Sequence, residues 1–145
     1  MSLFLDTGVI VGAANPRDAN HAAASRLLAA IGTGQFGDVV TSDYVFDEAV
    51  TLAFARTQRA EITVRVGELI LGTGSAGRIM GIAYVSPQVF LRAWARFQRL
   101  AQRGLSFTDC TSLELVDGLH FDEIASFDHG FDGLVPRRAD VDGRS

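Results

Sequence analysis

Short apolar segments alternate with longer amphipathic segments along the chain, and this alternation constrains its fold more than any other feature. The apolar segments have the length of buried strands, and the amphipathic segments repeat their apolar residues at helical spacing. Strands are predicted at residues 3–5, 38–41, 78–85 and 122–127. Helices are predicted from residue 18 or 20 to 31, and over residues 42–58, 60–71, 86–104 and 106–119. This order predicts an α/β fold with a mostly parallel central sheet and helices on both faces.

The chain has the length of one domain. Its 145 residues can bury a single core, and they contain no internal repeat, linker or low-complexity segment. We therefore predict one domain over residues 1–136. Residues 137–145 are largely polar and are expected to form a frayed C-terminal tail.

The composition excludes several classes of protein. All 13 basic side chains other than histidine are arginine, so a P-loop and a Schiff-base mechanism, which both need lysine, are excluded. Cys110 is the single cysteine, which leaves neither an intrachain disulfide nor a thiolate zinc site. The N-terminus has no basic segment and no long apolar stretch, so we expect a cytoplasmic protein without a membrane span.

Several apparent motifs are better explained by structure than by function. Spaced glycines at residues 32–37 and 72–77 match a dinucleotide-binding fingerprint, but each set follows a helix and precedes a strand, the reverse of the required order. Cys110 lies among apolar helical residues, where packing is its expected role. The three histidines, His21, His120 and His129, lack the spacing of metal ligands, and only His129 has acidic neighbours.

The carboxylate at position 6 needs a physical explanation. Asp6 follows the predicted strand Leu3–Leu5 and precedes a second apolar segment. A buried carboxylate costs several kcal/mol unless it is paired, hydrogen-bonded or bound to a cation, and the structural alternative to a cation site is a helix N-cap. The residue alone does not decide between these two roles.

Further acids occupy comparable positions. Glu48 projects near the apolar stripe of its helix, Asp109 lies in the first turn of another helix, and Asp128 follows the last predicted strand. Each has a structural alternative: a boundary side chain, a capping box and a turn, respectively. Asp132 is a spare acid one turn beyond Asp128, and the pattern does not settle its role.

Together the acids indicate a metal site. The ends of parallel strands and the first turns of the following helices meet at the carboxyl edge of a sheet, so these four carboxylates are predicted to lie together. Four carboxylates in one place repel one another unless a divalent cation neutralises them. Ligands made of oxygen alone favour Mg²⁺ or Mn²⁺ over zinc, and such a site can hydrolyse a phosphodiester.

Four segments, in this order, resemble the PIN-domain family. They are residues 5–10 (LDTGVI), 41–48 (TSDYVFDE), 105–109 (LSFTD) and 126–131 (SFDHGF). Their order and spacing are similar to those of VapC-type toxins of bacterial toxin–antitoxin systems, over nearly the whole chain. Gly8 and Ser126 depart from the usual pattern, because many members have serine or asparagine at the first position and threonine at the second.

The resemblance implies a three-layer α/β/α sandwich and an endoribonuclease that depends on Mg²⁺ or Mn²⁺. It also implies an RNA substrate, a homodimer and a cognate antitoxin that inhibits the enzyme. The catalytic, metal-binding acids that it implies are Asp6, Glu48, Asp109 and Asp128, and the supporting residues are Thr7, Ser106 and Ser126.

The predicted helix over residues 86–104 also carries side chains suited to a partner. It has an arginine stripe opposite its apolar stripe, and we expect this stripe to contact RNA phosphates, since a net charge of −4 gives no general attraction for nucleic acid. A solvated helix face is the structural alternative. The stripe consists of Arg92, Arg96, Arg99 and Arg103. Phe54, Phe90 and Trp94 are expected to supply apolar surface for the homodimer.

Other functions use the same features. A receiver-type signalling module would need a lysine at the sheet edge, which this chain lacks. A DNA nuclease or a metal-dependent phosphatase would use the same carboxylates, and residue types alone do not separate RNA from DNA. A non-catalytic PIN-fold RNA-binding or scaffold subunit, and an RNA-processing rather than toxic nuclease, also remain as alternatives.

Overall fold

The computed structural model describes residues 1–143 and contains a five-stranded sheet in the order β3-β2-β1-β4-β5. Every pair of neighbouring strands in it is parallel. The strands are β1 (Ser2–Leu5), β2 (Asp38–Ser42), β3 (Gly81–Ala83), β4 (Glu123–Ala125) and β5 (Arg137–Arg138). The predicted α/β fold with a parallel central sheet is therefore confirmed.

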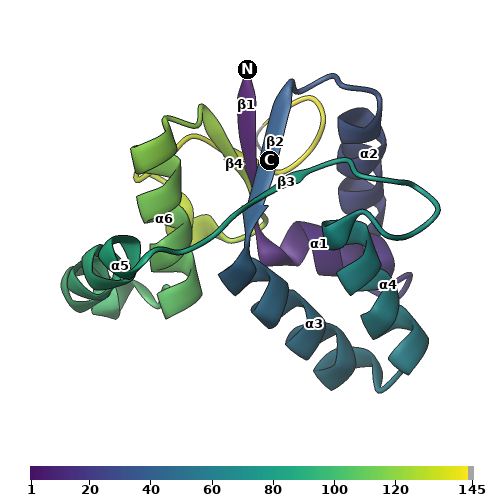
Figure 1. The fold of residues 1–145 in the computed structure, drawn as a ribbon, viewed down its shortest axis with the longest axis horizontal. Helices are drawn as coiled ribbons and strands as arrows, with labels where there is room; N and C mark the ends of the chain where they lie inside the picture. The colour runs from purple at the N-terminus through teal and green to yellow at the C-terminus, as the bar shows by residue number, and fades with distance from the viewer. Residues whose placement is uncertain (144–145) are drawn as a thin grey trace.

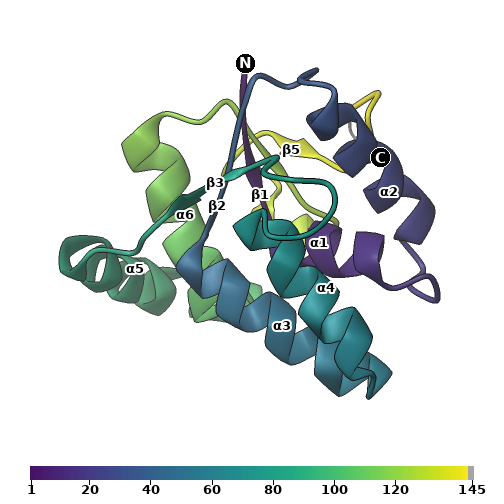
Figure 2. The same cartoon turned by 45° about the vertical axis from the view of Figure 1, so that its right-hand side comes forward.

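Helices cover the sheet on both sides, which gives the expected three layers. Helices α5 and α6 lie on one side, and α1, α2 and α4 lie on the other (Figures 1 and 2). The helices are α1 (Thr7–Ala14), α2 (His21–Gly32), α3 (Asp43–Thr57), α4 (Ala60–Leu71), α5 (Pro87–Leu100) and α6 (Phe107–Leu119), with short 3-10 turns η1 (Ala101–Arg103) and η2 (His129–Phe131). No helix among the described residues is long and apolar enough to cross a membrane.

The central strand β1 is buried on both of its faces. Leu3, Phe4 and Leu5 are all inaccessible to solvent, as is Ile124 on the neighbouring strand β4. A strand covered by helices on both sides has no polar face, which explains why these residues form an uninterrupted apolar run rather than an alternating pattern. The core therefore runs through the sheet and holds the carboxyl end of β1 in a fixed place.

Serine side chains define the starts of three helices that the sequence predicts. Ser42 accepts a hydrogen bond from the Val45 amide at 3.1 Å, and Ser86 does the same for the Val89 amide at 3.1 Å. Ser106 begins α6 in the same way. Each cap satisfies an amide that has no partner within the helix, so the predicted starts are confirmed.

Several elements differ from the prediction, among them β4, which spans Glu123–Ala125 rather than 122–127. Helix α1 was not expected, because six of its eight residues are buried and the segment has no polar face to show helical periodicity. Strand β3 is shorter than the predicted range of 78–85 and spans Gly81–Ala83. The apolar residues around it continue beyond the hydrogen-bonded ladder, which is why the composition overstated the length of the strand.

The expected frayed tail from residue 137 is wrong for residues 137–143. Arg137 and Arg138 form the edge strand β5, which pairs in parallel with Ile124 and Ala125 of β4. The Arg137 side chain is buried, because it forms several hydrogen bonds beneath the loop that follows β4. The sheet therefore extends past the predicted boundary at residue 136. Residues 144–145 of the predicted tail lie outside the described part of the chain.

Candidate metal and nuclease site

Asp6 lies directly beyond the carboxyl end of β1 and is almost completely buried. One carboxylate oxygen, Oδ2, accepts a hydrogen bond of 2.6 Å from the Ser126 hydroxyl, which lies beyond the end of β4. The other, Oδ1, is buried and has no hydrogen-bond partner among the described residues. Although Asp6 occupies the N-cap position of α1, its side chain forms no capping hydrogen bond. Helix capping therefore does not account for this buried carboxylate.

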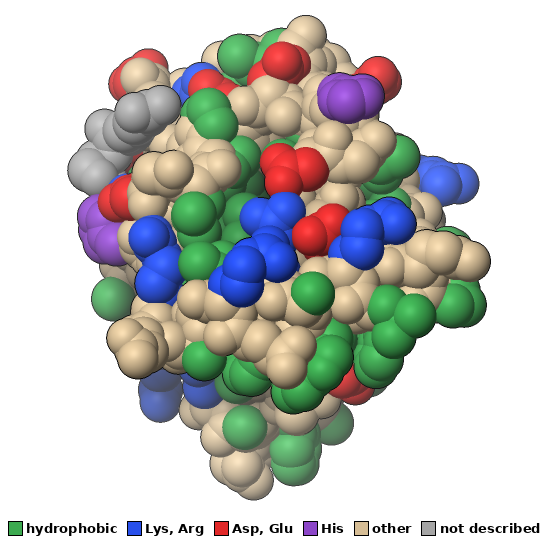
Figure 3. All heavy atoms as spheres, turned by 90° about the vertical axis from the view of Figure 1, so that its left-hand side faces the viewer, with side chains coloured by type: hydrophobic (Ala, Val, Ile, Leu, Met, Phe, Trp, Pro, Cys, Tyr) green, Lys and Arg blue, Asp and Glu red, His purple; other side chains and the backbone are tan. Residues whose placement is uncertain are grey.

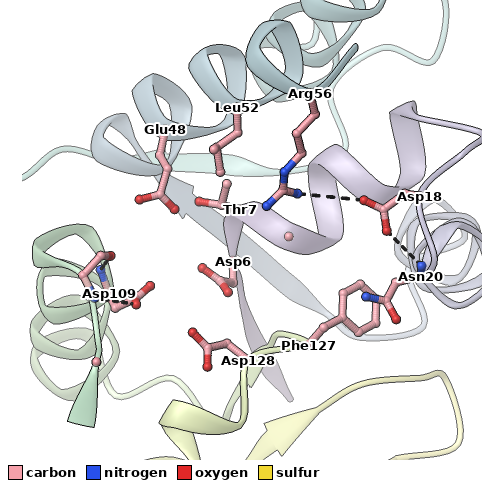
Figure 4. A pocket seen from close by; sticks show the side chains of 13 residues that line it. Asp6, Thr7, Asp18, Asn20, Glu48, Leu52, Arg56, Asp109, Phe127 and Asp128 are labelled. Atoms are coloured by element: carbon pink, nitrogen blue, oxygen red, sulfur yellow. Dashed lines mark hydrogen bonds and ion pairs between the residues drawn. The ribbon is translucent and has the colours of Figure 1, made fainter. Parts of the chain in front are cut away.

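Three other acids lie near Asp6 on separate elements. Glu48 is on the second turn of α3, Asp109 is on the first turn of α6, and Asp128 is in the loop after β4. All four acids line a single cavity of about 480 Å³ at the carboxyl edge of the sheet. Figure 4 shows their side chains around the same space. The structure thus brings together the four acids that the sequence predicted to meet.

Two of these acids also have the structural roles considered as alternatives. Asp109 and Ser106 form a capping box, in which Asp109 Oδ2 accepts from the Ser106 amide at 2.9 Å and Ser106 Oγ accepts from the Asp109 amide at 3.0 Å. Asp128 Oδ1 accepts from the Gly130 amide at 2.7 Å and shapes a turn. These bonds hold the two carboxylates at the edge of the cavity, so the local role and a role in the site are compatible.

Burial and mutual repulsion disfavour negative charge in this cavity. Burial and the nearby Asp109 carboxylate together raise the pKa of Asp6 to about 7, although hydrogen bonding with the Ser126 hydroxyl and the Thr7 backbone opposes this change. Burial and the Glu48 carboxylate together raise the pKa of Asp109 to about 6, although the hydrogen bonds with Ser106 oppose this change. Carboxylates with raised pKa values in a cleft are typical of functional sites. A bound cation would reverse both effects, because it favours the ionised form.

The chemistry of the donors fits a divalent cation that prefers oxygen. Besides the unpartnered Oδ1 of Asp6, the Thr7 hydroxyl oxygen is buried without a hydrogen-bond partner in the described part of the chain. Both residues line the cavity. Within residues 1–143, no three acidic, histidine or cysteine side chains lie close enough together to bind one ion as they stand. Mg²⁺ usually retains several water ligands, so it does not need a complete cage of protein atoms.

Ser126 connects two of the acids. Its hydroxyl donates to Asp6 and accepts a 3.0 Å hydrogen bond from the Asp128 amide. Its backbone carbonyl accepts a 3.0 Å hydrogen bond from Arg137 on β5. Arg137 also donates to Asp132 at 2.7 Å, and His129 contacts the same carboxylate at 2.9 Å. These bonds with Arg137 and His129 hold the pKa of Asp132 down to about 2.

The spare acid of the sequence therefore has a structural explanation. Asp132 is bound by Arg137 and does not line the cavity that contains Asp6. Arg137 was missed by sequence reasoning because it lies in the segment expected to be a frayed tail. Its signal was weak: two adjacent arginines in an otherwise unremarkable C-terminal segment.

The arginine stripe of α5 and η1 largely forms contacts within the molecule. Arg96, expected on the exposed side, lies against α6, where it donates to Glu114 at 2.9 Å and to Asp117 at 2.6 Å. Arg92 lies 3.4 Å from Glu114. Arg103 donates to the backbone carbonyls of Gly130 and Asp132.

Figure 3 shows acidic side chains among the basic ones on this face of the molecule. The assignment of Arg96 to a free stripe is corrected, since the acids of α6 draw it inward. RNA contact by Arg92, Arg99 and Arg103 stays a prediction.

The remaining sequence features behave as expected. Cys110 is fully buried, which confirms a packing role. His21 contacts the Gly12 carbonyl at 2.8 Å through Nδ1 and so joins α2 to α1. Phe54, Phe90 and Trp94 each expose more than two fifths of their surface, at 47%, 43% and 49%, so the predicted apolar surface exists. Asp18, Leu52 and Arg56 line the acidic cavity and were not singled out as site residues, because nothing local in the sequence connects them.

Comparison with known proteins agrees with this geometry. The chain is similar to VapC20 of Mycobacterium tuberculosis, described as a toxin that cleaves the sarcin–ricin loop, with 26% identity, 99% coverage of each chain and a TM-score of 0.79. It shares its fold with FitAcB from Neisseria gonorrhoeae, with 18% identity, coverage of 93% of this chain and 95% of the other, and a TM-score of 0.62. A search of functionally curated proteins found no match. The PIN-domain model matches residues 3–134, and the chain therefore belongs to the PIN-domain family.

Proposed function

We propose that this protein is a metal-dependent endoribonuclease and the toxin of a toxin–antitoxin pair. The observation that carries the proposal is the cavity in which Asp6, Glu48, Asp109 and Asp128 meet, with Asp6 buried and one of its oxygens unpartnered. Membership of the PIN-domain family and similarity to VapC20, a toxin, support the same conclusion.

Asp6, Glu48 and Asp109 would hold Mg²⁺ or Mn²⁺, in part through water molecules. The bound ion would supply a Lewis acid that lowers the pKa of a water molecule and neutralises charge on the phosphodiester. Asp128 is exposed at the mouth of the cavity, where its carboxylate can accept a hydrogen bond from the attacking water or contribute to a second ion. Ser126 fixes the position of Asp6 relative to Asp128, because its hydroxyl is hydrogen-bonded to both residues.

The partner proposed for this site is a cognate antitoxin. Arginine can bond two carboxylates at once, so an antitoxin arginine that enters the cavity would compete with the cation for the same oxygens. The remainder of the antitoxin segment would lie along helices α3 and α4. We further propose a homodimer in which the exposed Phe54, Phe90 and Trp94 supply apolar contact surface.

The decisive test is cleavage of single-stranded RNA and DNA of the same sequence. We expect cleavage of RNA with Mg²⁺ or Mn²⁺, none in EDTA, and a loss of more than a hundredfold in kcat for Asp6→Asn. Asp38→Asn is a matched control, because Asp38 is exposed and has no hydrogen bond or ion pair through its side chain in the described structure. Activity that persists in chelator would rule out the metal mechanism. A folded protein with no activity on any RNA would favour the non-catalytic scaffold alternative.

A further inference from the structure

A second cavity, lined by three arginines, adjoins the acidic one. It has a volume of about 260 Å³ and is lined by Arg17 from the loop between α1 and α2, Arg56 from the last turn of α3, and Arg59 at the start of α4. Arg56 lines both cavities. It is also the one basic residue among the described residues that line the acidic cavity. The carboxylate site therefore continues directly into a positively charged wall.

Two of these three guanidinium groups are available to a ligand. Within the described residues, the Arg17 side chain forms no hydrogen bond or ion pair, and it is exposed. Arg56 is half exposed, and the carboxylate paired with it, Asp18, is 4.0 Å away, at the limit of an ion pair (Figure 4). Arg59 is bonded to the exposed Glu61 and forms the outer wall. This differs from α5 and η1, where Arg96 and Arg103 already have partners.

A polyanion that approaches the carboxylates needs such a wall. Five acids line the cavity: Asp6, Asp18, Glu48, Asp109 and Asp128. Their charge repels the phosphates on either side of the bond to be cleaved, and a cation bound among them offsets only part of this repulsion. A guanidinium matches the geometry of a phosphate through two parallel hydrogen bonds.

We propose that Arg17 and Arg56 form a phosphate-binding subsite for the RNA backbone beside the carboxylate site. The subsite rests on the proposed ribonuclease function. It also predicts the path of the RNA away from the metal site, along the end of α3 and the loop between α1 and α2. It is assembled from residues 39 positions apart in the sequence, so no linear motif reveals it.

The test measures RNA binding and cleavage separately. Binding of a labelled single-stranded RNA to Arg17→Gln, Arg56→Gln and the double variant is followed by fluorescence anisotropy in an Asp6→Asn background, which prevents cleavage. Arg65→Gln is the matched control, since Arg65 is an exposed arginine of α4 that has no hydrogen bond or ion pair in the described chain and lines a different cavity. The substituted side chains are exposed, and thermal melting checks that the fold is intact.

We expect the double variant to bind RNA about tenfold more weakly at moderate salt. The slope of log affinity against log salt should fall by about 0.7 for each lost phosphate contact. In a chain that retains Asp6 and can cleave RNA, the double variant should raise KM more than it lowers kcat. Arg65→Gln should change affinity less than twofold. Unchanged RNA affinity and salt slope in the double variant would overturn the subsite. Failure of the wild-type chain to cleave RNA would instead count against the proposed function, because the binding assay does not depend on cleavage.

Discussion

Replacing Asp6 by asparagine should stabilise the metal-free protein while it abolishes activity. The folded protein holds the proton of Asp6 with a pKa of about 7, against 3.8 for an ordinary aspartate. A difference of this size corresponds to about 4 kcal/mol, at about 1.4 kcal/mol for each pH unit. Asparagine resembles the protonated aspartate in shape and charge, and its carbonyl can still accept the hydrogen bond from Ser126. At pH values where Asp6 of the wild type is ionised, Asp6→Asn should therefore be more stable by nearly this full amount.

The sign of the pH dependence follows from the direction of the pKa change. Because the folded-state pKa of Asp6 is raised, its protonated form stabilises the fold at low pH, and this contribution is lost as the pH rises from about 4 to about 7. Asparagine does not titrate, so its contribution to stability stays the same between about pH 4 and about pH 7. The advantage of Asp6→Asn should thus be about 4 kcal/mol at pH 8, roughly half of that near pH 5.5, and close to zero near pH 4.

The assay is urea denaturation between pH 5 and pH 8.5 in EDTA, repeated in Mg²⁺. For a domain of this size, about 4 kcal/mol corresponds to roughly 10 °C in melting temperature. Mg²⁺ should stabilise the wild type more than the variant, because an ion that binds only the folded state adds to its stability. Asp38→Asn should show neither effect. If Asp6→Asn is less stable than the wild type at pH 8 in EDTA, Asp6 is a structural residue and the electrostatic reasoning fails.

Three further predictions use the same protein. Arg137→Met should lower the free energy of unfolding by about 2 kcal/mol, because it leaves the buried Ser126 carbonyl without its donor. Arg26→Met, which breaks only an exposed ion pair, should have a much smaller effect; equal losses in urea denaturation would contradict the role of Arg137. Sedimentation at micromolar concentration should show a dimer that Trp94→Ser weakens, and a monomer at all concentrations would refute association through this surface. Raising Mg²⁺ should weaken inhibition by the cognate antitoxin, and replacing the arginine that enters the cavity should preserve binding but reduce inhibition; insensitivity to both changes would mean that the antitoxin blocks the RNA path instead.

Features that depend on neighbours in the sequence could be predicted. Ser42, Ser86 and Ser106 each bond to an amide three residues further on, so the helix starts were visible in the chain. Asp6, Glu48, Asp109 and Asp128 could be placed together because parallel strands end at a common edge. Helix α1 could not be predicted in the same way, because burial on nearly all sides removes the periodicity that marks a helix.

Features that depend on distant contacts could not be predicted. Arg96 and Arg99 look equivalent in the sequence, and only the position of Glu114 and Asp117 on α6 turns Arg96 inward. Arg56 lines the acidic cavity because the end of α3 lies beside the loop before α2. No local sequence pattern predicts this arrangement. Arg137 is buried because β5 adds to the sheet, and a two-residue strand has too little sequence to be recognised.

The hydrogen bond between Asp6 and Ser126 determines how late in synthesis the acidic cavity can form. Its two residues are 120 positions apart, and β1 lies between β2 and β4 in the sheet. A ribosome needs on the order of ten seconds to make the intervening chain. During that interval β1 has no β4 beside it, and the carboxylates of Asp6 and Asp128 have no common cavity. On the proposed function, a chain that is still being translated should therefore lack ribonuclease activity until β4 and the loop after it have been made, and a truncated product that ends before β4 should lack it as well.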